Sequence, residues 1–291
     1  MSLSTPIVTD TLVSYPDGAL VSSGTVLHVE PLPDGRAAVV LDRTAFHPVD
    51  PVWPDQPADQ GTLTVAGVSH PVLDAVVGAT DGTSLFVGDA PVRTGTDGWV
   101  FVVCHLVADA TGIEPGSAAE IAVEPDGRRA LSAGHTACHL ASLALNESLA
   151  ALWTKEVPRD GRGNPNFDQL AIEESRILPN GSLDTYRIGK SLRKKGFAAA
   201  ELPGVLDEVT ATANALLAGW VASSAPVAIA RTGEGLGERR TWRCELPDAV
   251  VEFPCGGTHL TSLGELSGAR VSLELETVDG ALELRMRTTA S

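Results

Sequence analysis

The stretch RRALSAGHTACHLASLALNESLAALW, residues 128–153, separates two parts of the chain that have different sequence patterns. From Leu131 onward it contains no proline and, after Gly134, no glycine, and its leucines recur at helical spacing. This periodicity predicts a helix. We therefore predict two domains, residues 1–127 and residues 128–291, each long enough to bury a core of its own.

Upstream of the predicted helix, short β-rich runs are separated by turn signals. Short alternating runs with regular turns are typical of an antiparallel all-β unit. The fold predicted for residues 1–127 is a small antiparallel β-barrel. The turn signals are Pro33-Asp34-Gly35, Thr80-Asp81-Gly82, Thr96-Asp97-Gly98 and Pro125-Asp126-Gly127.

Downstream of it, the pattern mixes one more helix with several strands. Residues 202–221 have a helical pattern with Pro203 in the first turn, a position that proline tolerates. The pair Asp279-Gly280 lies between two alternating runs and predicts a hairpin turn. We predict an α+β domain in which helices pack on an antiparallel sheet. Its strands are expected at 226–230, 241–246, 271–275 and 281–286.

Composition narrows the classes of function. The chain has 291 residues and four scattered cysteines. These are too few for a disulfide framework, which favours metal or thiol chemistry in a reducing compartment. The N-terminus lacks a basic segment followed by an apolar one, and no apolar run approaches the ~18 residues that span a bilayer. We therefore expect a cytoplasmic protein with no membrane partner.

The formal net charge of −16 opposes nucleic-acid binding in bulk, because nucleic-acid-binding proteins usually neutralise phosphates with a basic surface. No DNA partner is expected, and any RNA contact must be local. One basic cluster holds three of the four lysines and no acidic residue, and it is either an RNA contact or a solvated loop or helix face. The basic cluster consists of Arg187, Lys190, Arg193, Lys194 and Lys195.

Two histidines of the predicted helix suit a metal ion. His135 and His139 are four positions apart, which puts both imidazoles on one helix face with Cβ atoms about 5 to 6 Å apart. Far downstream, a Cys-Gly-Gly-Thr-His segment supplies a thiolate, Cys255, and a third imidazole, His259. By chance both pairs together are expected only about 0.02 times.

Three nitrogens and one sulfur form a typical tetrahedral zinc set. The sequence predicts one zinc ion held by His135, His139, Cys255 and His259, in either a catalytic or a closed structural site. Cys138 is a competing thiolate because it lies three residues after the first histidine. No carboxylate adjoins either motif as in a His-Glu-x-x-His protease, which argues against a peptidase.

Two motifs carry a family resemblance. Gly134-His-Thr-Ala-Cys-His-Leu140 and Pro254-Cys-Gly-Gly-Thr-His-Leu-Thr-Ser-Leu-Gly-Glu-Leu266 together resemble the paired motif of free-standing alanyl-tRNA editing proteins. The same pair resembles the editing domain of alanyl-tRNA and threonyl-tRNA synthetases. Upstream, Asp42-Arg-Thr-Ala-Phe-His-Pro48 is similar to the start of the family's β-barrel signature. The resemblance covers most of the chain.

The resemblance implies a zinc-dependent hydrolase that serves translation fidelity. Its partner would be the aminoacylated acceptor end of tRNA, and its reaction the removal of seryl or glycyl groups from alanine tRNA. Thr44, by its match to the barrel signature, is a candidate hydroxyl donor near the substrate, or else an ordinary strand threonine. Thr258, beside the glycines of its loop, is a candidate for orienting the loop or the substrate.

The chain departs from the family at one motif. Members usually carry a Gly-Gly-Gly-Gln run before an aspartate, whereas this chain reads Val52-Trp-Pro-Asp-Gln-Pro-Ala-Asp59. Gln56 and Asp59 remain, but the glycines that let a backbone approach a substrate are replaced. Two other functions therefore stay open. One is hydrolysis of a different aminoacyl ester, and the other is a non-catalytic RNA-binding or scaffold protein with structural zinc.

Overall fold

The computed structural model describes residues 6–291, which divide into two compact units. The first unit combines the described part of Met1–Arg128 with Ile229–Arg240 and Gly256–Thr258. The second unit contains the other residues from 129 to 291. Both units are discontinuous in sequence, so the single domain boundary after residue 127 stays a prediction. The protein belongs to the α+β class and consists mostly of antiparallel sheets with few helices.

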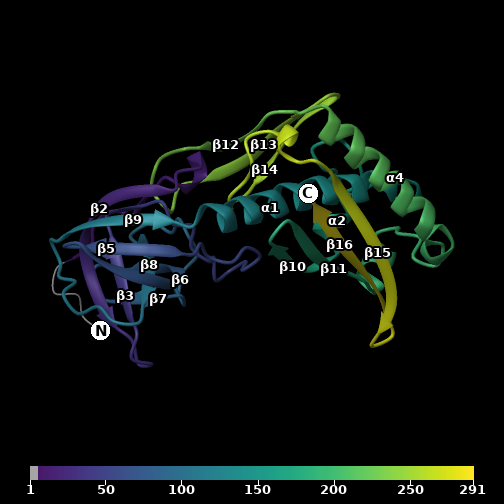
Figure 1. Cartoon of the computed structure of the whole chain (residues 1–291). Coiled ribbons are helices and arrows are strands. Elements are labelled where there is room, and N and C mark those ends of the chain that lie inside the picture. Colours follow the sequence, from purple (N-terminus) through teal and green to yellow (C-terminus); the bar gives the residue numbers. More distant parts are fainter. Residues whose placement is uncertain (1–5) are drawn as a thin grey trace. The chain divides into compact units, whose positions relative to one another are not determined.

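The first unit is built on a seven-stranded sheet with the order β5-β9-β2-β3-β8-β6-β7, in which β5 also pairs with β6 (Figure 1). Every pairing in this sheet is antiparallel, as the alternating runs predict, whereas β1 and β4 form a short parallel pair. The closed barrel layout stays a prediction. The strands are β1 (Leu12–Val13), β2 (Val21–Pro31), β3 (Ala37–Leu41), β4 (Arg43–Thr44), β5 (Gly61–Val65), β6 (Val68–Thr80), β7 (Leu85–Val87), β8 (Val100–Val107) and β9 (Ala118–Val123).

Alternation along the strands produces the core of this unit. On β9, Ala119, Ile121 and Val123 are buried while the residues between them are exposed, because successive side chains of a strand point to opposite faces. Leu63 and Phe101 belong to the same core. Full burial of each such large apolar side chain contributes about 1.5 to 3 kcal/mol. This burial is what holds the strands together.

A buried ion pair connects Arg128, in the first turn of the long helix, to Asp59 in a loop of the first unit. Arg128 Nε donates to Asp59 Oδ1 at 2.7 Å, and its Nη2 donates to the other carboxylate oxygen and to the carbonyl of Ala45. Asp59 also accepts the backbone N–H of His47. Removing one partner would leave an uncompensated buried charge, at a cost of about 3 to 5 kcal/mol. Asp59 therefore has a structural task in the loop where the family glycines are missing.

Two buried histidines of the first unit resist protonation. Burial lowers the pKa of His105 to about 4. Burial, reinforced by the charge of Arg128, lowers the pKa of His47 to about 3. In the unfolded chain the two imidazoles have a pKa near 6.5 and become protonated below that pH. In the native state they stay neutral to a lower pH, so acid favours the unfolded chain. The stability that neutral histidines provide is therefore present above about pH 6.5 and is lost as the pH falls towards 4.

We expect acidification from about pH 7 to about pH 5 to lower the free energy of unfolding by about 2 kcal/mol for each of these histidines. Urea unfolding at both pH values measures the loss. His105→Gln should make the pH dependence shallower than that of the wild type. A His105→Gln variant with the wild-type pH dependence would contradict this assignment.

The second unit combines helices with two sheets. A four-stranded antiparallel sheet has the order β10-β11-β16-β15, and a three-stranded sheet has the order β12-β13-β14. The helices are α1 (Pro125–Ser148), whose first residues belong to the first unit, α2 (Phe167–Ala171), α3 (Lys190–Lys194) and α4 (Leu202–Ala222). The strands are β10 (Ile172–Leu178), β11 (Gly181–Ile188), β12 (Val227–Arg231), β13 (Arg240–Leu246), β14 (Ala249–Pro254), β15 (Ala269–Val278) and β16 (Ala281–Ala290).

The predicted elements downstream of α1 are confirmed. Helix α4 matches the pattern at 202–221, and strands lie at all four predicted places. Asp279 and Gly280 have φ values of 50° and 74°, the left-handed pair that a tight two-residue hairpin turn requires. Helix α4 lies along β15, where Asn214 exchanges two hydrogen bonds with the backbone of Val271 (Figure 1).

Helix α1 begins earlier than the sequence predicts. The turn predicted at Pro125-Asp126-Gly127 is wrong, because these residues form the first turn of the helix. Proline suits a first helical turn, where its missing N–H has no partner to lose. The carboxylate of Glu124 accepts the backbone N–H groups of Asp126 and Gly127, and so caps the helix.

Glycine lets α1 approach the β10–β11 hairpin. A Cβ at Gly134 would clash with the carbonyl oxygens of Leu178 and Gly181. Close to this point, Leu131 and Cys138 of the helix pack against Ile177 of β10. The close approach therefore fixes the helical turn on which the first predicted metal ligand lies.

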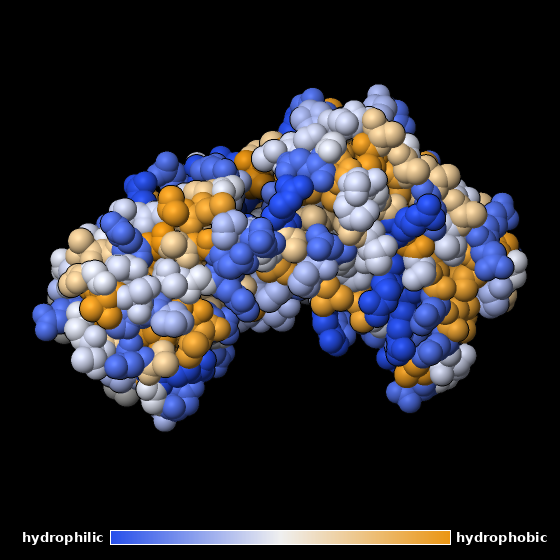
Figure 2. Space-filling view, in the orientation of Figure 1, coloured by the Kyte–Doolittle hydropathy of each residue, from blue (hydrophilic) through white to orange (hydrophobic). Residues whose placement is uncertain are grey.

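Within residues 6–291, no helix is long and apolar enough to cross a membrane. On the face drawn in Figure 2, hydrophilic side chains surround separate groups of apolar ones. The exposed large apolar residues include Val52 and Trp53, which lie in the loop that replaces the family glycines.

Candidate metal centre

The four predicted metal ligands come together in the second unit. His135 and His139 extend from α1, Cys255 directly follows β14, and His259 lies four residues further on. One ligand atom from each side chain lies within 4.8 Å of those of the other three. These four residues, the metal cluster from here on, can hold a metal ion.

The distances within the metal cluster suit a tetrahedral ion. Cys255 Sγ lies 3.5 Å from His135 Nε2 and 3.3 Å from His259 Nε2. With Zn–N near ~2.0 Å and Zn–S near ~2.3 Å, two ligands of a tetrahedral site are separated by about 3.5 Å. The centroids of the three imidazole rings are 4.3 to 4.6 Å apart, so the rings lie next to one another.

The imidazole of His139 is neutral, as a metal ligand must be. Burial, and secondarily the neighbouring His135, lowers its pKa well below the ordinary value, which keeps the imidazole neutral. A neutral ring has a lone pair to donate to a metal. Its Nδ1 is buried without a hydrogen-bond partner. The edge contacts of the ring with Trp242 and Phe253, at 4.9 and 4.5 Å between centroids, fix its orientation.

The four members of the metal cluster differ in exposure. His135 is 2% exposed, but His139, Cys255 and His259 are partly exposed as whole residues. A tetrahedral ion with four protein ligands has no open position, so a substrate would reach it only as a fifth ligand or in place of one of the four.

Cys138, the competing thiolate, faces a different group. Its Sγ lies 3.5 Å from Asp184 Oδ1, and Ser175 and Ser182 donate to the same carboxylate at 2.5 and 2.7 Å. Burial and the charge of Asp184 raise the pKa of the thiol well above its ordinary value. A buried protonated thiol is a poor metal ligand. Among the described residues, the metal cluster contains Cys255 and not Cys138.

No protein-family model matches the chain. The chain is similar to alanine–tRNA ligases. It is 25% identical to the alanine–tRNA ligase of Gluconobacter oxydans over 244 residues, which cover 84% of this chain and 24% of the relative. It is also 25% identical to that of Paramagnetospirillum magneticum over 275 residues, which cover 93% of this chain and 27% of the relative.

The similarity to alanine–tRNA ligases extends over most of this chain. The second alignment covers 93% of the chain and leaves about 20 residues out. The segment after His259, residues 260–291, is longer than that. The alignment therefore extends past His259 and includes all four residues of the metal cluster. The chain itself spans only about a quarter of the length of these relatives. The comparison therefore supports a relationship to part of a tRNA ligase, and not to the whole enzyme.

Gln56 and Thr258 form a hydrogen-bonded clasp in the first unit. Gln56 Nε2 donates to Thr258 Oγ1 at 2.9 Å, and the Thr258 backbone N–H donates to Gln56 Oε1 at 3.0 Å. Both residues are buried. Thr258 immediately precedes the ligand His259 in the chain, and its role in orienting the loop or the substrate stays a prediction. The sequence indicates each residue but not their pairing, because they are 202 positions apart.

We expect Gln56→Leu to lower the free energy of unfolding by about 1 to 3 kcal/mol, because a buried backbone N–H loses its acceptor. Urea or thermal unfolding measures the change. Gln60→Leu, a similar change at an exposed residue four positions away, should have little effect. Equal stability of the two variants would mean that the clasp does not hold this loop.

Thr44 lies inside the first unit, with no exposed surface. The Val39 carbonyl can only accept, so the 3.0 Å contact requires a proton on His105 Nδ1. The Thr44 hydroxyl then donates to His105 Nε2 at 2.8 Å and accepts the Phe46 N–H. A substrate would have to replace one of these bonds. The role of Thr44 as a hydroxyl donor to substrate stays a prediction.

The basic cluster lies on the surface of the second unit. Arg187 is at the end of β11, where Glu173 lies 3.7 Å away, and α3 supplies three further members. All five members are exposed, while Leu192 is buried and anchors the short helix. The basic cluster therefore extends from the end of β11 to the residue that follows α3. Its role in RNA binding stays a prediction.

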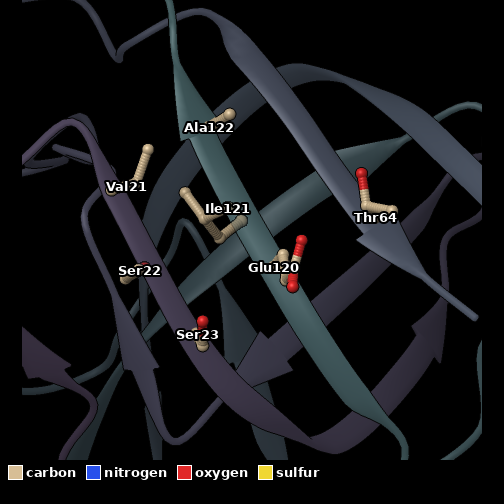
Figure 3. A pocket seen from close by; sticks show the side chains of 7 residues that line it. All are labelled: Val21, Ser22, Ser23, Thr64, Glu120, Ile121 and Ala122. Carbon is tan, nitrogen blue, oxygen red and sulfur yellow. The ribbon is translucent and has the colours of Figure 1, made fainter. Parts of the chain in front are cut away.

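A hollow of about 380 Å³ lies in the first unit, against β2, β9 and β5 (Figure 3). Glu120 is the charged residue of its lining, and the others are small or apolar. None of the candidate site residues lines it. The lining residues are Val21, Ser22, Ser23, Thr64, Glu120, Ile121 and Ala122.

Proposed function

We propose that this chain is a zinc-dependent hydrolase that removes a wrong amino acid from tRNA, most directly a seryl or glycyl group on alanine tRNA. The observation that carries the proposal is the metal cluster, three imidazoles and a thiolate, in a chain similar to alanine–tRNA ligases. We propose zinc as the ion because it prefers this donor set. A free-standing editing protein of this kind would work in the cytoplasm, where charged tRNA is found.

Zinc held by these four residues would polarise an ester carbonyl, or would lower the pKa of a water bound to it towards ~7. The residues of the chain provide the remaining requirements. Trp242 and Phe253 hold the ring of His139, and the partial exposure of His139, Cys255 and His259 supports access for an aminoacyl ester. No carboxylate belongs to the metal cluster, which supports an ester hydrolase over a peptidase that uses a glutamate base.

A deacylation screen tests the proposal. The zinc-loaded full chain is mixed with alanine tRNA that carries labelled serine, glycine or alanine, and with other mischarged tRNAs, and the released amino acid is measured. We expect release of serine or glycine and retention of alanine. Hydrolysis of small aminoacyl esters without any tRNA activity would indicate a different ester substrate. An inactive chain with bound zinc would contradict the proposal.

We expect tRNA affinity to depend on the basic cluster, because the bulk charge of −16 repels phosphate elsewhere. Replacing all five residues with Gln should weaken binding and flatten the log–log salt dependence by about 0.7 to 0.9 for each phosphate that is no longer neutralised. Filter binding over a range of salt concentrations measures both effects.

A control variant with Arg43, Arg93 and Arg239 replaced by Gln removes exposed positive charge from the first unit. This control should bind tRNA with nearly the wild-type affinity and salt dependence. Unchanged binding in the five-residue variant would exclude the basic cluster.

A further inference from the structure

Thr136 lies between the two histidine ligands of α1, and its side chain is completely buried. Its Oγ1 lies 3.3 Å from His259 Nδ1 and accepts the backbone N–H of Leu260 at 3.1 Å. One hydroxyl of the helix therefore contacts both the ring and the following backbone of the ligand on the loop. None of the expectations from the sequence assigns this residue a role.

The two nitrogens of His259 face different groups. Nδ1 faces the Thr136 hydroxyl, whereas Nε2 lies 3.3 Å from the sulfur of Cys255. A neutral imidazole carries its proton on one nitrogen and a lone pair on the other. A hydroxyl oxygen has two lone pairs, so Thr136 can accept from Leu260 and from Nδ1–H together.

We propose that Thr136 is a positioning residue that accepts the Nδ1–H of His259 and so directs the Nε2 lone pair into the metal cluster. The inference rests on the proposed function in one respect, that the metal cluster binds zinc. In metal sites the partner of the second imidazole nitrogen fixes the tautomer and the orientation of the ring.

A hydrogen bond to Thr136 restrains the ligand that lies outside the helix. His135 and His139 are held by a long helix, but His259 follows Gly256 and Gly257 on a loop with no regular structure of its own. Glycines leave a backbone free to adopt many conformations. The Thr136 hydroxyl connects this loop to the helix that carries the other two imidazoles, and so sets all three relative to one another.

Two variants test the proposal in the full chain. Thr136→Val keeps the shape of the side chain but removes the hydroxyl, and Thr136→Ser keeps the hydroxyl. Zinc affinity is measured by competition with a chromophoric chelator. We expect Thr136→Val to bind zinc about 10- to 100-fold more weakly than the wild type, and Thr136→Ser to stay within about threefold. Thr210→Val is the matched control, because Thr210 is a helical threonine of α4 outside the site.

Nitrogen NMR of the metal-free chain provides a readout that a loss of stability alone would not change. The His259 ring, assigned with a His259→Asn variant, should carry its proton on Nδ1 in the wild type and in Thr136→Ser. It should lose this preference in Thr136→Val. Thermal unfolding of the metal-free variants verifies that each one is folded.

The outcomes separate this inference from the proposed function. Wild-type zinc affinity in Thr136→Val, or equally weak binding in Thr136→Ser, would overturn the role of the hydroxyl and leave the metal cluster standing. A wild-type chain that binds no zinc would overturn both. A chain that binds zinc with the expected differences among the variants but hydrolyses no ester would support the inference and overturn the proposed function alone.

Discussion

We expect His139→Ala to abolish the hydrolysis of mischarged tRNA while the chain stays folded. The change removes one of the three imidazoles of the metal cluster, and with it the donor set on which the reaction depends. Alanine is the most favourable residue in a helix interior. The buried Nδ1 of His139 has no hydrogen-bond partner to lose, so the structural cost is limited to packing against Trp242 and Phe253.

Release of labelled serine from alanine tRNA measures the activity, and circular dichroism with thermal unfolding measures the fold. His70→Ala, a change at a partly exposed histidine of the first unit, is the control and should keep full activity. Persistent hydrolysis by His139→Ala would contradict a catalytic metal centre. An unfolded His139→Ala chain would instead indicate structural zinc, and His139→Gln, which retains more side-chain volume, would repeat the test.

The second large effect concerns the ion itself. We expect the purified chain to contain one zinc, and the double variant His135→Ala with Cys255→Ala to contain none. Two ligands from separate segments are removed, and the two imidazoles that remain are too few for a tetrahedral site. Elemental analysis of the dialysed proteins measures zinc per chain.

Cys138→Ala is the matched control, because Cys138 lies on the same helix but contacts Asp184. It should retain one zinc per chain. Zinc content that is unchanged in the double variant, or that disappears in Cys138→Ala, would show that the ligand assignment is wrong. Because the measurement needs no substrate, it stands whatever the deacylation screen yields.

The sequence does not predict the strands at 172–188, although β11 alternates. Its buried positions include Ser182, Asp184 and Tyr186, which are polar. The carboxylate of Asp184 is buried because Ser175, Ser182 and Cys138 surround it with donors. Strand prediction depends on apolar residues at alternate positions, and here polar residues occupy the buried positions. The donors that allow Asp184 to be buried include residues of other elements, Cys138 and Ser175.

Local pattern alone predicts the elements with a strong period or turn, such as α4 and the hairpin at Asp279-Gly280. Residue type and local spacing indicate which side chains are candidate metal ligands. The three-dimensional arrangement was needed to show that Cys255 and not Cys138 joins His135, since both thiols are plausible by spacing.

The same holds for hydrogen bonds between residues that are far apart in the sequence. Gln56 and Thr258 are 202 positions apart, and Thr136 and His259 are 123 positions apart. A side-chain hydrogen bond depends on separations of about 3 Å and on donor direction, and neither is encoded in local pattern. The sequence specifies which groups can bind a metal, and the packing of the loop against α1 decides which of their atoms meet.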